Sequence, residues 1–170
     1  MVVDLGLDAA GLLEVVQPVC DEVHVAILAG PGNSAPVVAG AASTTAVTSA
    51  GLETGESAAD AIVQLVERHG AHIVALPSTH RFREVAAIVT ARLGAACAPD
   101  VLSVRRGEDG LTAERMLYGG VVIATVALQR PTVVVTAKVG SSGDLAGGDA
   151  PTEAIETAAV SGKQLISSEQ

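Results

Sequence analysis

The chain has 170 residues, of which 49% are hydrophobic and 17% are charged, and this composition suits one globular domain and excludes a chain that is disordered throughout. Its formal net charge of −9, with only ten Lys and Arg, excludes the basic face that a nucleic-acid-binding protein needs and argues against an anionic membrane as partner. One Tyr, one Phe and no Trp exclude an aromatic platform for single-stranded nucleic acid.

The first half of the chain alternates helical and strand patterns. Apolar residues at helical spacing predict a helix from Leu7 to near Pro18, and residues 23–28 have the continuous apolar run of a buried strand. A loop rich in Gly and Pro follows, and residues 37–49 fit either a small helix or a short strand. Residues 56–70 predict a second helix, for which Ser57 is the expected N-cap.

The sharpest element boundary lies near the middle of the chain. HIVALP, residues 72–77, predicts a buried strand, STHR predicts a short polar turn, and residues 80–94 predict a helix. Because strands and helices alternate from residue 1 to residue 94, we expect an α/β fold with a parallel sheet covered by helices on both faces.

The second half is rich in strands. Residues 99–140 contain three or four strand-like runs, with GEDG and YGG as turns between them and no helical pattern. The run of Val within residues 132–140 does not alternate with polar residues, so we expect that strand at the centre of the sheet. Residues 141–170 are small and polar and predict a linker or tail, with a late strand near residues 158–160 as an addition, after a domain of residues 1–140.

The sequence shows no pattern for a metal site, a membrane span or a catalytic site. Cys20 and Cys97 are far apart, without a CxxC motif or a His at ligand spacing, so we expect two buried free thiols rather than a disulfide or a metal site. The first residues carry an acid where a signal peptide has a basic region, and no apolar run reaches the roughly 18 residues that span a membrane, so we expect a cytoplasmic protein without membrane insertion. We find no catalytic triad or paired-carboxylate pattern and expect no catalytic residue.

The turn before the helix at residue 80 is the candidate ligand site. Parallel α/β proteins commonly bind phosphate on the N–H groups of a helix N-terminus, and Ser and Thr hydroxyls can contact the same anion. The weak anion site predicted here consists of Ser78, Thr79, His80 and Arg81. The alternative is that the hydroxyls only cap the helix. The other histidines are expected to be structural, at strand and helix ends: His24, His69 and His72.

The lone tyrosine stands between two expected strands, in the sequence RMLYGGVVIATV. After Tyr118, the glycines Gly119 and Gly120 either form a hairpin turn or let a partner approach closely. The apolar runs 121–126 and 132–139 must be covered or risk edge pairing, so we predict an oligomer whose interface contains Tyr118. A monomer whose helices cover both faces of the sheet is the alternative.

Four stretches, in this order, resemble the N-terminal domain of the electron transfer flavoprotein alpha subunit: LPST, VTARLGAACAPDVLSV, ERMLYGGVVIATV and RPTVVVTAKVG. The resemblance covers about residues 56–140, and Tyr118 falls where that family has its tyrosine. It implies a three-layer α/β/α fold of the adenine-nucleotide alpha-hydrolase-like type, with a mostly parallel sheet and extra antiparallel strands in its C-terminal half.

The chain departs from that family at several points. His80 and Arg81 stand where the family has Gly-Lys, and Lys138 stands where it has Arg. The alpha subunit also continues into a second domain that holds most of the FAD contacts, and nothing like the opening of that domain occurs here. The resemblance therefore implies a docking scaffold for a beta-like subunit, not a catalyst alone, with FAD bound only in the assembly or not at all.

Other interpretations stay open. The chain could instead be a stand-alone nucleotide-binding module that takes AMP at residues 78–81, or a fragment of a longer electron carrier. Self-association could also take the place of a beta-like partner.

Overall fold

The structure is a computed structural model, and it describes residues 2–4, 9–29, 36–49, 52, 54–138 and 145–157. The described residues contain three α-helices, α1 (Ala9–Val16), α2 (Gly55–His69) and α3 (His80–Leu93), and two 3-10 turns, η1 (Gln17–Val19) and η2 (Tyr118–Gly120). None of the helices within these ranges is both long enough and apolar enough to cross a membrane.

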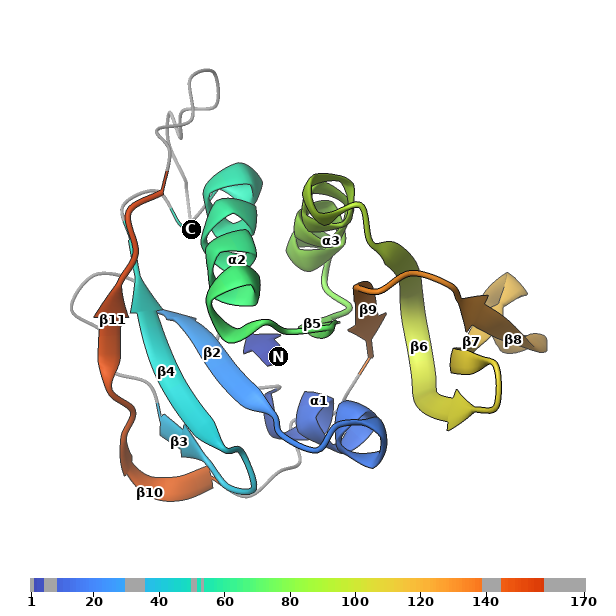
Figure 1. The fold of residues 1–170 in the computed structure, drawn as a ribbon, viewed down its shortest axis with the longest axis horizontal. Helices are drawn as coiled ribbons and strands as arrows, with labels where there is room; N and C mark the ends of the chain where they lie inside the picture. Colours follow the sequence, from blue (N-terminus) through green and yellow to red (C-terminus); the bar gives the residue numbers. More distant parts are fainter. Residues whose placement is uncertain are drawn as a thin grey trace.

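One large sheet runs through the described part of the molecule in the order β11-β4-β2-β1-β5-β9-β6-β7-β8 (Figure 1). Its strands are β1 (Val2–Asp4), β2 (His24–Ala29), β4 (Ser43–Thr48), β5 (Ile73–Pro77), β6 (Ala96–Gly107), β7 (Gly110–Leu117), β8 (Val122–Leu128), β9 (Val133–Ala137) and β11 (Thr152–Ala154). A separate pair joins β3 (Pro36–Val38) to β10 (Leu145–Asp149). The ambiguous stretch at residues 37–49 therefore forms strands.

The sheet is parallel from β11 to β6 and antiparallel from β6 to β8. This confirms the expected parallel sheet with antiparallel additions in the C-terminal half. The Val-rich strand β9 lies between β5 and β6, and all five of its residues are buried, as its unbroken apolar run predicts.

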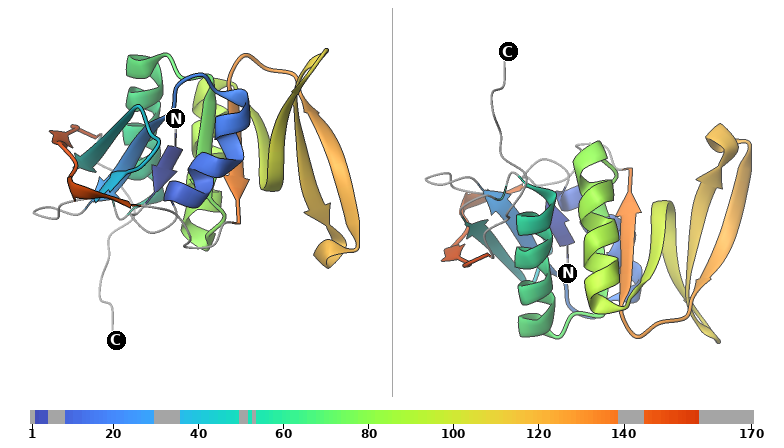
Figure 2. Two further views of the ribbon diagram at one scale, coloured as in Figure 1. Left: turned by 90° about the horizontal axis from the view of Figure 1, so that it is seen from below. Right: turned by 90° about the horizontal axis from the view of Figure 1, so that it is seen from above.

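Helices cover both faces of the parallel part, which makes three layers (Figure 2). One core lies between α1 and one face of the strands and contains Leu12, Val25 and Val133. The other core lies between α2, α3 and the opposite face and contains Ile62, Val74 and Val134. Neighbouring residues of one strand thus enter opposite cores, because strand side chains alternate. The three-layer α/β/α prediction is confirmed.

The cap of α2 lies three residues earlier than predicted. Thr54, with an extended backbone, is the N-cap, and its hydroxyl accepts a hydrogen bond from the N–H of Ser57 at 3.2 Å. Ser57 lies inside the first turn and is buried, so its prediction as N-cap was wrong. At the other end, Gly70 has a left-handed backbone with φ of 58° and caps the helix, and the predicted helical range, residues 56–70, ends at the same residue.

The antiparallel strands form an arm, residues 101–128, that extends the sheet beyond the layer of helices (Figure 2). The turn between β6 and β7 contains Glu108 and Asp109, and η2 joins β7 to β8, as the sequence predicts. One face of the arm's base packs into the core beside α1 through Val104 and Ala113. The arm is therefore anchored at its base and exposed at its far end.

Part of the predicted tail belongs to the sheets. Residues 141–170 were expected to be a linker or tail, but β10 pairs with β3, and β11 pairs in parallel with β4. Ile155, directly after β11, is 4% exposed and packs into the core beside α2. The predicted late strand at residues 158–160 lies outside the described residues, as does most of the Gly- and Pro-rich loop.

Candidate functional site

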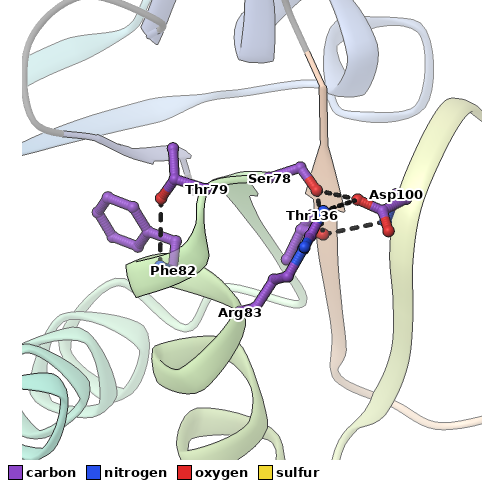
Figure 3. Close-up of polar contacts among 6 residues, drawn as sticks. All are labelled: Ser78, Thr79, Phe82, Arg83, Asp100 and Thr136. Carbon is purple, nitrogen blue, oxygen red and sulfur yellow. Dashed lines mark hydrogen bonds and ion pairs between the residues drawn. The ribbon is translucent and has the colours of Figure 1, made fainter.

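The turn before α3 lies where β5 ends, beside the end of β9 (Figure 3). The N–H of Ser78 donates to the carbonyl of Ala137 at 2.8 Å, which joins the turn to β9. Thr79 has an extended backbone, and its hydroxyl accepts from the N–H of Phe82 at 3.3 Å. Thr79 is therefore the N-cap of α3, and the fully buried Phe82 anchors the first turn in the core.

The hydroxyl of Ser78 points away from the helix, toward Asp100 on β6 (Figure 3). It donates to Oδ1 of Asp100, and Nη2 of Arg83 lies 3.3 Å from the same oxygen. The N–H of Asp100 donates at 3.0 Å to Oγ1 of Thr136, a fully buried residue of β9. These contacts join four elements: the β5–α3 turn, α3, β6 and β9.

The electrostatics of this cluster favour the charged form of Asp100. The hydroxyl of Ser78 has the largest effect and holds the pKa of the Asp100 carboxyl below its usual range. Burial, the next largest effect, raises this pKa, and the positive charges of Arg83 and Arg115 lower it further. A carboxylate beside the first turn of α3 also suits the helix dipole. The cluster thus supplies its own anion at this helix end.

The structure brings the four predicted anion-site residues into one turn, where three side chains already have partners in the chain. Ser78 binds Asp100 and Thr79 caps the helix, while the guanidinium of Arg81 donates to the carbonyl of Leu52. His80 is the exposed first residue of α3. An incoming anion would lie near the Asp100 carboxylate, which repels it, so the weak anion site at Ser78, Thr79, His80 and Arg81 stays a prediction.

Most of the large apolar side chains that are exposed in the described residues lie at the far end of the arm. Tyr118 is 81% exposed, Val121 83% and Ile123 64%. Together with the less exposed Met116 and Val122 they form what we call the tip patch. Tyr118 and both following glycines have positive φ values, with 69° at Gly119 and 95° at Gly120, so the glycines are needed for the turn itself.

The three remaining histidines lie where the parallel strands begin, at the end of the sheet opposite to the turn before α3. The rings of His24, at the start of β2, and His69, at the end of α2, stack with centroids 4.6 Å apart. Nδ1 of His24 lies 2.8 Å from Oγ of Ser43, and His72 stands just before β5. They line a hollow of about 280 Å³. The sequence predicts their places at element ends but not the stack, since 45 residues separate the two rings' positions along the chain.

The two cysteines differ from the prediction and from each other. Cys20 is half-buried, and burial raises the pKa of its thiol, whereas Cys97 on β6 is exposed. The expectation of two buried thiols was therefore wrong for Cys97. Both are free thiols, and the His, Cys, Asp and Glu side chains in the described ranges form no group of three that could hold a metal ion.

An open groove of about 530 Å³ runs between α1 and β6, and sequence reasoning gave no sign of it. Its lining is mostly apolar, with Glu14 from α1 and Arg105 from β6 as charged members. Lys138, directly after β9, is exposed and also lines this groove. None of the predicted anion-site residues reaches it.

Comparison with known proteins gives a consistent result. The family described as "Electron transfer flavoprotein domain" matches residues 19–162. Protein FixB of two Escherichia coli strains, O127:H6 (strain E2348/69 / EPEC) and O6:H1 (strain CFT073 / ATCC 700928 / UPEC), is 34% identical over 87 residues, which is 51% of this chain. The aligned stretch covers 28% of the length of these FixB proteins.

Proposed function

Since the chain belongs to the electron transfer flavoprotein domain family, we propose that it serves as an alpha-subunit-like docking domain in flavin-based electron transfer. In this role it binds a beta-like subunit and does not catalyse a reaction by itself. The family match, the similarity to FixB and the order of the sequence motifs support the family role. A cytoplasmic location stays a prediction of the same proposal.

The observation that carries the docking role is the tip patch. Five apolar side chains at the end of an antiparallel arm are at least 42% exposed, and Tyr118 and Val121 are exposed by more than four fifths. Soluble monomers rarely expose several large apolar groups together, and such patches commonly mark protein interfaces. Tyr118 is the favoured anchor because a tyrosine ring buries a large area while its hydroxyl can stay hydrated.

Sedimentation velocity of the chain mixed with a beta-type electron transfer flavoprotein subunit tests this role. We expect a heterodimer for the wild type and an affinity about tenfold or more weaker for Tyr118→Ala, the loss typical of an interface anchor. Glu108→Ala, an exposed change in the opposite turn of the arm, should leave the affinity unchanged.

Each other outcome has a definite meaning. A wild-type chain that sediments as a dimer alone and ignores the beta-type subunit would identify a second copy as the partner. A wild-type chain that stays monomeric in both samples would exclude the docking role. Unchanged binding by a folded Tyr118→Ala variant would remove the tip patch from the interface.

The described residues do not fit a flavin ring. An isoalloxazine ring needs flat apolar or aromatic side chains to cover it. The chain has one Phe and one Tyr and no Trp, and neither ring lines a pocket for a flavin: Phe82 is fully buried in the core, and Tyr118 lies exposed at the tip of the arm. We therefore propose that FAD is not retained by the chain alone and is bound, if at all, in the assembly. Stoichiometric flavin absorbance that survives desalting of the isolated chain would contradict this.

A stand-alone AMP-binding module is the less favoured candidate. It needs groups at the N-terminus of α3 to turn toward a phosphate, and those of Ser78, Thr79 and Arg81 already bind within the chain. The Asp100 carboxylate beside them adds repulsion.

A further inference from the structure

The strand β6 changes its partner near Asp100. β6 pairs in parallel with β9 from Ala96 to Val101 and in antiparallel fashion with β7 from Val101 to Gly107, so the two pairings meet directly after Asp100. From Ala98 to Val101 the chain advances three residues on β6, while the matching positions on β9 advance two, from 135 to 137. The extra residue is a β-bulge, the feature that bends a strand and redirects it.

The bulge places Asp100 in an unusual backbone conformation. Its φ of 55° lies in the left-handed region, which Asp tolerates better than most residues but which still costs free energy. Such a conformation persists where the surroundings hold it. Here the backbone N–H is bound to Thr136, and the carboxylate is bound to Ser78 and lies within 3.3 Å of Arg83.

Besides the pairing of Val101 with Ala137 of β9, three kinds of contact join the arm to the rest of the described residues. The first is apolar packing of Val101, Val104 and Ala113 in the core beside α1, and such packing has little directional preference. The second is the set of hydrogen bonds at Asp100, which are directional and come from three separate elements of the core. A third, smaller contact is the bond from Arg106 to the carbonyl of Val19 at 3.0 Å.

We propose that Asp100 fixes the orientation of the arm relative to the parallel sheet and so positions the tip patch for its partner. Packing at the base holds the arm against the core, and Asp100 selects one angle among those that packing allows. Asp100 is a positioning residue, since its side chain and N–H bind the core, while the next residue, Val101, pairs with Arg115 of β7, which directly precedes Met116 of the tip patch. The part that concerns the partner rests on the proposed function, whereas the part that concerns orientation does not.

Residual dipolar couplings of backbone amides, measured on the isolated chain, test the orientation. In the wild type we expect one alignment to fit both the arm and residues 54–93. In Asp100→Gly, which keeps the left-handed backbone accessible but removes the carboxylate, the couplings of the arm should fall by about half or more relative to the core, as expected for motion of one part against another.

Three further variants make the result specific. Ser78→Ala removes a donor to the carboxylate without altering β6 and should reproduce the effect of Asp100→Gly. Asp100→Asn keeps a side-chain oxygen that accepts from Ser78, so its effect should be smaller. Asp109→Gly is the matched control, because it makes the same substitution in the exposed β6–β7 turn and should leave the couplings unchanged.

Couplings in Asp100→Gly and Ser78→Ala that fit the wild-type orientation would overturn the proposal, since packing alone would then hold the arm. If Asp100→Gly fails to fold, Ser78→Ala decides by itself. The affinity for a beta-type subunit is a second measurement: Asp100→Gly should bind that subunit more weakly than the wild type, although no residue of the tip patch is changed. A wild-type chain that binds no beta-type subunit would defeat the proposed function and leave the orientation result standing.

Discussion

At the scale of single residues, His69 is held in surroundings that disfavour its protonated form. Partial burial lowers the pKa of His69 first, and the neighbouring His24 and Arg68 lower it further, against a weaker opposing effect of Glu22. The unfolded chain therefore binds a proton at His69 more readily than the folded chain. The contribution of His69 to the free energy of unfolding is thus present above its ordinary pKa of 6.5 and is lost as the pH falls through the folded pKa.

The lowered pKa of His69 predicts a pH dependence of the free energy of unfolding that His69→Gln should remove. We expect the free energy of unfolding of the wild type to fall more steeply than that of His69→Gln as the pH drops below 6.5. Urea unfolding at a series of pH values measures both. His80→Gln, at an exposed position of α3, should follow the wild type. Parallel profiles for the wild type and His69→Gln would show that the stack with His24 does not affect this equilibrium.

The sequence predicted contacts of single residues where those contacts are local. Thr79 could be identified as a possible cap because an N-cap bond joins residues three apart. The bonds of Asp100 to Ser78 and Thr136 span 22 and 36 residues, so no local pattern contains them. The resemblance placed Asp100 within one of the family's motifs but gave no role to its side chain.

At the scale of elements, the hydrogen bond at the start of α2 shows which of two residues, Thr54 or Ser57, is the N-cap. Thr54 supplies the acceptor for an N–H of the first turn, whereas Ser57 supplies only the donor. We expect Thr54→Ala to lower the free energy of unfolding by about 1 kcal/mol, and Ser57→Ala to have a smaller effect. Thermal or urea unfolding of the two variants compares them directly. A larger loss for Ser57→Ala would restore Ser57 as the cap.

The helices and strands followed from apolar periodicity, but the bend of β6 did not. Residues 99–138, the described part of the strand-rich stretch, form strands separated by turns as predicted, because GEDG and YGG interrupt the apolar runs. Whether one strand continues from a parallel pairing into an antiparallel one depends on the register with both β9 and β7. That register is a property of three strands together and cannot be obtained from one of them.

At the scale of the whole molecule, the predicted linker contributes to the core. β11 extends the sheet at the edge opposite the arm, and Ile155 packs with the residues under α2. The sequence predicts a linker here because the two strands are short and contain Gly, Asp and Thr, which are not typical of a buried strand. Only the pairing with β3 and β4, about one hundred residues earlier in the chain, gives them their structure.

Ile155 tests this part of the fold. Truncation of a buried isoleucine removes apolar contacts and leaves a cavity, so we expect Ile155→Ala to lower the free energy of unfolding by about 2–4 kcal/mol. Glu156→Ala, at the exposed neighbouring position, should change it by less than about 0.5 kcal/mol. Equal and negligible effects of the two variants would return this stretch to the role of a linker.

In the proposed function, the arm docks this electron transfer flavoprotein domain onto its partner. Hydrogen exchange of the backbone amides, with and without a beta-type subunit, tests it most directly. We expect exchange slowed by about tenfold or more at residues 116–123, which include the tip patch, with little change at residues 78–83 before and within α3. Unchanged exchange throughout the arm, or slowing confined to another surface such as the groove between α1 and β6, would contradict it.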